Sequence, residues 1–128
     1  MLSGNEVKLS TYTSLRINGV KAGTNVKSII LKDRDKISKG IIVMYDIDEE
    51  KTKEHFRKED FYKLLGRGFT LEVKDNDPDC SINNIITISK CFMNECGTVI
   101  SAGEIRLFVC KFTYLKENKK VEKYKNRK

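Results

Sequence analysis

The sequence predicts an α+β domain built mainly from antiparallel strands. Three observations predict this class: short segments in which apolar and polar residues alternate, one stretch with helical spacing, and turn residues between them. The chain has 128 residues, and domains most often have roughly 100–150. With 39% hydrophobic residues, one proline and eight glycines, collagen-like and Pro/Gly-rich disordered classes are excluded. We therefore expect one globular domain.

The N-terminal segment predicts a half-buried strand followed by a hairpin. Asn18-Gly19 favours a type I′ turn, in which both central residues have positive φ. A second strand is expected over residues 25–31, and the apolar run over 41–47 is typical of a central strand. The apolar parity of the first strand consists of Val7, Leu9, Thr11, Thr13, Leu15 and Ile17.

One helix is expected near residues 49–65. Asp48, Glu49 and Glu50 lie at its start, where the helix dipole favours negative charge. Gly66 follows the stretch and suits the C′ position, which requires a left-handed conformation. The apolar stripe consists of Phe56, Phe61, Leu64 and Leu65.

The C-terminal half predicts three more strands, over 69–74, 82–92 and 105–115. A turn is expected at 94–97 and a bulge at Ala102-Gly103. The order β-β-β-α-β-β favours a small OB-like barrel, with a related sheet carrying one helix, or a β-sandwich, as alternatives. The predicted core consists of Leu9, Ile17, Val43, Leu71, Val73, Ile86, Leu107 and Val109.

Charge divides the chain at residue 115. The formal net charge is +7, and residues 116–128 contain seven bases but only two acids. We therefore expect a globular domain over 1–115 and a basic C-terminal tail over 116–128. Such a tail indicates an interaction arm for nucleic acid, an acidic protein surface or another anionic surface. A solubilising terminus is the alternative interpretation.

Aromatic residues interleaved with bases favour sequence-nonspecific binding of nucleic acid, with single-stranded DNA or RNA preferred. Bases stack on exposed aromatic rings while lysines follow the phosphates. Arginine, which reads guanine edges bidentately, supplies only six of the 25 basic residues. The predicted contact residues are Tyr12, Arg16, Arg67, Lys111, Tyr114, Lys119, Lys120, Lys123, Tyr124, Lys125, Arg127 and Lys128.

The sequence predicts an intracellular protein without a membrane partner. Residues 1–10 contain no apolar signal region, and no run reaches the roughly 18–20 apolar residues of a membrane span. The four cysteines are then expected to be reduced. Abundant Lys, Ile and Asn are typical of an AT-rich genome, such as that of a virus or a parasite.

Two motifs resemble metal sites but lack the full pattern. Cys91 and Cys96 are separated by four residues, whereas structural zinc favours paired C-x2-C spacing. Asp75, Asp77 and Asp79 have the 1-3-5 spacing of a calcium loop, but the sixth and twelfth positions are Cys80 and Ile86. We expect buried thiols, an acidic turn and no metal or other cofactor.

An enzyme is not expected. His55 is the only histidine and lies among charged residues, without the burial or partner that tunes a catalytic group. Gly66-Arg67-Gly68 follows the helix instead of preceding one, so it does not match a phosphate-binding loop. The first hypothesis is thus a non-enzymatic nucleic-acid-binding module. The alternative is a non-catalytic protein-interaction or assembly subunit of a larger complex, such as a viral one.

Overall fold

The computed structural model describes residues 5–8, 13–22, 26–34, 36–46, 56–100, 103 and 106–125, with backbone only at 5–8 and at residue 100. Strands dominate these ranges, with one α-helix and one 3-10 turn. In chain order the elements are β1 (Asn5–Lys8), β2 (Thr13–Ile17), β3 (Val20–Lys21), β4 (Val26–Lys32), β5 (Ile37–Tyr45), α1 (Lys58–Lys63), β6 (Gly68–Asp75), β7 (Ile82–Ile100), β8 (Arg106–Leu115), η1 (Lys116–Asn118) and β9 (Lys119–Lys125).

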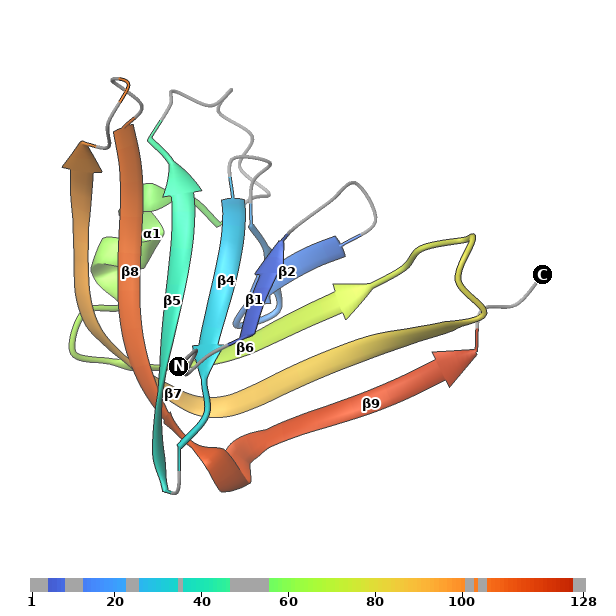
Figure 1. The fold of residues 1–128 in the computed structure, drawn as a ribbon. Coiled ribbons are helices and arrows are strands. Elements are labelled where there is room, and N and C mark those ends of the chain that lie inside the picture. The colour runs from blue at the N-terminus through green and yellow to red at the C-terminus, as the bar shows by residue number, and fades with distance from the viewer. Residues whose placement is uncertain are drawn as a thin grey trace.

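The strands form one curved antiparallel sheet in the order β1-β4-β5-β8-β7-β6-β2-β3, with β9 on β7 (Figure 1). This confirms the predicted α+β class with mainly antiparallel strands. The order begins at β1 and ends at β3 without pairing these two strands. Because the sheet is not closed, the OB-like barrel is not confirmed.

Strand β7 is the longest element and connects the two parts of the sheet. Its first half pairs with both β6 and β9, and its second half pairs with β8. The turn predicted at 94–97 is therefore wrong. Glu95 and Cys96 remain paired with Lys111 and Cys110, and the polar residues produce only a register shift between Met93 and Glu95.

Helix α1 is shorter than predicted and covers the inner face of the sheet. Its N-terminus is capped where the Arg57 N–H donates to Asp60 Oδ2 at 2.9 Å. The chain leaves the helix at Gly66, which has a φ of 71° and confirms the predicted helix end. The Phe61 ring lies 6.3 Å from the ring of Phe108 on β8. The predicted start near residue 49 lies outside the described residues.

The predicted turn at Asn18-Gly19 is confirmed, but the strand that returns from it is β3, and the strand expected over 25–31 is β4, which pairs with β1 and β5 instead of β2. Asn18 and Gly19 have φ values of 51° and 82°, as a type I′ turn requires. Asn18 also exchanges hydrogen bonds with Thr70 on β6, through its backbone N–H and its side-chain oxygen, both at 2.9 Å. These bonds hold the hairpin against the neighbouring strand.

The predicted core is only partly correct. Ile17, Leu71 and Val73 are buried, and Ile86 packs against the core. Leu9 lies outside the described residues. The remaining three predicted core residues are wrong, because they are partly exposed on the outer face, opposite α1: Val43, Leu107 and Val109.

The error has a simple physical origin in the alternation of strands. The segments 41–44 and 107–110 are apolar at both parities, and a shift by one residue exchanges the two faces of a strand. The parity that is buried consists instead of Ile42, Met44, Phe108 and Cys110.

The predicted C-terminal tail is also corrected. The Lys116 N–H donates to the Lys36 carbonyl at 3.0 Å, and Lys119–Lys125 pairs with β7 as strand β9. Residues 116–125 thus belong to the sheet, and residues 126–128 lie outside the described part. Among all the residues that the structure describes, no helix is long and apolar enough to cross a membrane.

The two faces of the sheet predict different costs for two similar substitutions. Leu71→Ala removes a side chain with no exposed surface and should lower the free energy of unfolding by about 2–5 kcal/mol. Leu107→Ala should cost clearly less, because Leu107 is partly exposed on the outer face. Urea denaturation measures both. An equal cost would contradict the assignment of faces.

Candidate nucleic-acid interface

A polar row crosses five strands on the outer face of the sheet. The register places Arg16 opposite both Lys21 and Glu72, Glu72 opposite Thr87, and Thr87 opposite Lys120. We call these five residues the basic row. Cross-strand partners share one face of a sheet, so the row presents three cations and one carboxylate together.

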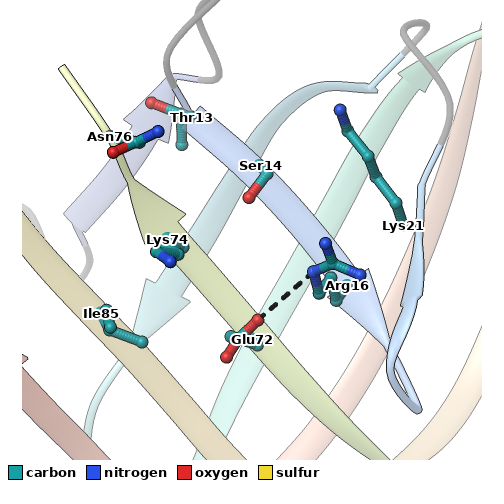
Figure 2. Close-up of a pocket in the computed structure, with 8 residues that line it drawn as sticks. All are labelled: Thr13, Ser14, Arg16, Lys21, Glu72, Lys74, Asn76 and Ile85. Atoms are coloured by element: carbon teal, nitrogen blue, oxygen red, sulfur yellow. Dashed lines mark ion pairs between the residues drawn. The ribbon is translucent and has the colours of Figure 1, made fainter. Parts of the chain in front are cut away.

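An open groove of about 350 Å³ lies over one end of the basic row (Figure 2). Lys74 joins it there, because the register places Lys74 opposite Ser14 and Ile85. Hydroxyl and amide groups complete the wall with hydrogen-bonding atoms. The lining residues are Thr13, Ser14, Arg16, Lys21, Glu72, Lys74, Asn76 and Ile85.

The groove keeps an excess of positive charge. Arg16 Nε lies 3.7 Å from Glu72 Oε2, with both side chains partly exposed, and such surface pairs are weak. Arg16 Nη1 also donates to the Gly19 carbonyl at 3.2 Å, which holds the guanidinium beside the hairpin turn. Within the described residues, Lys21 and Lys74 form no ion pair. An anion can therefore approach their ammonium groups.

Tyr124 connects β9 to the end of β6 and borders this surface. Its hydroxyl donates to the Asp75 carbonyl and lies 3.3 Å from Asn76 Oδ1. Lys74 Nζ lies 5.5 Å from the centroid of the Tyr124 ring, in a cation–π contact. The ring is half-buried, so Tyr124 positions Lys74 and β9 more than it offers a free stacking surface.

The lysines of β9 do not form one surface, as they would in the interaction arm that the sequence predicted. Lys120 belongs to the basic row. Lys123 and Lys125 lie opposite Asn84 and Ile82, on the other face of the strand. Lys119 Nζ binds Asp33 Oδ2 at 2.6 Å.

The assignment of Tyr114 as a nucleic-acid contact is corrected. Only 2% of Tyr114 is exposed, and its hydroxyl donates to Asp33 Oδ1. Burial and the neighbouring Asp33 carboxylate both raise the pKa of Tyr114. The ring therefore packs in the core, and the hydroxyl helps to hold the loop between β4 and β5.

Asp33 is held ionised by the same contacts. Burial alone would raise its pKa, but the hydrogen bonds from Lys119 and Tyr114 outweigh burial and lower the pKa below the ordinary value of 3.8. The carboxylate thus ties the first residue of β9 and the core residue Tyr114 to one loop.

The remaining predicted contact residues are scattered. Arg67 is exposed after α1, and its carbonyl accepts the Met93 N–H at 3.1 Å. Lys111 lies on the outer face of β8, where its Nζ is 4.0 Å from Glu95 Oε2. Tyr12, Arg127 and Lys128 lie outside the described residues.

Sequence reasoning missed Lys21, Lys74 and the aromatic residue Phe92. The polar parity of residues 69–74 already placed Lys74 on an outer face, but only the register brings it beside Arg16. Phe92 is 45% exposed and lines, with Lys90 and Thr70, an open pocket of about 370 Å³. Phe92 therefore offers an exposed ring beside a lysine, whereas Tyr114 is buried.

The prediction of buried thiols is confirmed for Cys91 and Cys110, but Cys96 is only partly buried and Cys80 is exposed. Burial raises the pKa of Cys91 to about 12, and its thiol donates to the Ile88 carbonyl at 3.5 Å. The Asp79 N–H donates to Asp77 Oδ1 at 2.9 Å, which closes a turn before β7. Among the described residues, no three His, Cys, Asp or Glu side chains are grouped to hold a metal ion. His55 lies outside them.

No protein-family model and no curated protein matches the chain.

The contacts of Asp33 predict a pH dependence of stability. Folding lowers the pKa of Asp33. The ionised carboxylate therefore contributes fully to the free energy of unfolding above about pH 5, and this contribution is lost as the pH falls through 3.8 to the folded pKa. Asp33→Asn should therefore be less stable at pH 7, and its stability should fall less steeply below about pH 4. Thermal denaturation from pH 2 to 7 measures this. Asp79→Asn, at an exposed position, serves as the control. Its stability should fall below about pH 4 as steeply as that of the unchanged protein.

Proposed function

We propose that the protein is a non-enzymatic module that binds nucleic acid without sequence preference, with single-stranded DNA or RNA favoured. The supporting observation is the basic row, in which Lys21, Arg16 and Lys120 share one face, with Lys74 beside them. Neighbouring strands are about 4.8 Å apart, so the row extends over roughly 19 Å. That length accommodates a few nucleotides along the phosphate backbone.

The chemistry of this surface favours phosphates over base edges. Lysine acts as a point charge without bidentate geometry, and neutralising phosphates releases counterions whatever the sequence. Arg16, the only arginine of the row, already forms an ion pair with Glu72 and donates a hydrogen bond to the Gly19 carbonyl. Ser14 and Asn76 add hydrogen-bonding groups to the groove. Binding would therefore depend on charge and not on sequence.

Phe92 supplies the stacking surface that the proposal requires. Its parity places it on the outer face, opposite Gly68 on β6 and Thr113 on β8. Glycine leaves the ring unobstructed on one side, and Lys90 lines the same pocket. A base stacked on this ring would keep its phosphate close to a lysine, as on single-strand platforms.

Charge substitutions in the groove test the proposal. Arg16→Gln, Lys21→Gln and Lys74→Gln combined should weaken binding to a single-stranded oligonucleotide and flatten its salt dependence. The log–log slope should fall by about 0.7 for each phosphate that is no longer neutralised, up to about 2 in total. Glu72→Gln should act in the opposite direction, since it removes a repelling carboxylate. Fluorescence anisotropy over a salt series measures both.

The matched control carries three exposed lysines changed elsewhere, Lys27→Gln, Lys36→Gln and Lys63→Gln. It has the same net charge as the groove variant and should bind more tightly than that variant. Equal loss in both would show that only total charge matters. Absence of binding by the unchanged protein at about 50 mM salt would contradict the proposal.

Removal of the Phe92 ring should weaken binding without changing the salt slope. Stacking contributes about 1–3 kcal/mol per base and releases no counterions, so Phe92→Leu should lower affinity at every salt concentration by the same factor. Val99→Ala removes apolar surface from another exposed position of β7 and should leave affinity unchanged. A changed slope in Phe92→Leu would assign the ring a different role.

A further inference from the structure

A second surface lies on the outer face of β4, β5, β8 and the second half of β7, and it is apolar. The register aligns Val43 with Val109, and Tyr45 with Leu107, which is in turn opposite Val99. We call this surface the outer apolar face. It consists of Ile30, Ile41, Val43, Tyr45, Val99, Leu107 and Val109.

Every residue of the outer apolar face keeps some exposure to solvent. Val99 is 51% exposed and Tyr45 37%, and the other five residues are partly exposed. Helix α1 packs on the opposite side of these strands, through Phe61 and Phe108 (Figure 1). Antiparallel sheets with one solvated face normally carry polar residues there, and apolar sheet faces are buried by a further layer. This face therefore has the composition of an interface.

Charge around the face favours an acidic partner. The charged residues of these strands that share the outer parity are Lys32, Lys39 and Lys111 against Glu95. Lys32 lies directly opposite Lys39, and like charges opposite each other in a sheet are destabilising. Acidic groups placed between them would relieve this repulsion.

We propose that the outer apolar face docks a segment of another protein in which apolar side chains are flanked by aspartate or glutamate. A second copy of this chain fits less well, because two such faces would bring six lysines together against two glutamates. Nucleic acid fits less well too, since six of the seven side chains are aliphatic and offer phosphates no hydrogen-bond donor, and Tyr45 offers only its hydroxyl. The three lysines would contact the acidic flanks, and the valines and isoleucines would contact the apolar side chains.

This surface is independent of the groove used in the proposed function. The groove lies on β2, β3, β6 and the first half of β7, whereas the outer apolar face begins at the second half of β7 and continues over β8, β5 and β4. The two proposals can therefore fail separately.

The test uses three labelled synthetic peptides of equal length and the full chain. One has an apolar stripe with glutamate flanks, one has the same stripe with lysine flanks, and one has the glutamates without the stripe. Only the first should bind in fluorescence anisotropy. Binding of the lysine-flanked peptide with equal affinity, or of none of the peptides, would overturn the proposal.

Variants locate the binding on this face. One variant combines Val43→Thr, Val99→Thr and Val109→Thr. These changes keep side-chain shape and strand propensity but replace apolar methyl groups by hydroxyls, and they should weaken binding of the first peptide by about tenfold or more. Lys39→Glu should weaken it as well. Arg16→Gln with Lys74→Gln is the matched control and should leave peptide binding unchanged.

Circular dichroism verifies that each variant is folded, and a single valine-to-threonine variant replaces the triple one if the triple one unfolds. Unchanged peptide binding in the folded valine variant would overturn the proposal. The proposal would also be overturned if the unchanged chain self-associates in sedimentation and the valine variant does not, because the face would then bind a second copy.

Discussion

The continuous pairing of β7 is the constraint on which the rest of the structure depends. Its first half is bonded to β6 and β9 and its second half to β8, so one strand belongs to both parts of the sheet. The register shift between Met93 and Glu95 lets it bend without ending the pairing. If the chain turned back at residues 94–97 instead, β8 would lose the partners it has in this half.

This continuity places two chemically different surfaces on one side of one sheet. The basic row crosses β3, β2, β6, β7 and β9, and the outer apolar face covers β4, β5, β8 and the second half of β7. The inner face holds one core beneath α1. A nucleic acid in the groove would therefore leave the outer apolar face accessible, and the proposed module could hold a nucleic acid and an acidic protein segment together.

Close packing inside the sheet depends on one glycine. The Phe112 ring lies against Gly40, where a Cβ would come within 2.1 Å of its Cζ atom. From this position the ring contacts Phe69 on β6, with centroids 5.5 Å apart, and Tyr114, at 5.9 Å. Tyr114 in turn reaches Asp33, which binds Lys119. A series of contacts thus links Gly40 on β5 to Lys119, the first residue of β9.

The sequence by itself determined the features that depend on local geometry. The Asn18-Gly19 hairpin, the helix end at Gly66 and the strand around Leu71 were predicted correctly, because positive φ and period-two alternation are properties of neighbouring residues. The tertiary structure alone decided which parity is buried in segments 41–44 and 107–110, since both parities are apolar there. It also decided that residues 119–125 form a strand, and that Lys21, Arg16 and Lys74 share a groove. The physical reason is that strand register joins residues distant along the chain, and no local pattern specifies it.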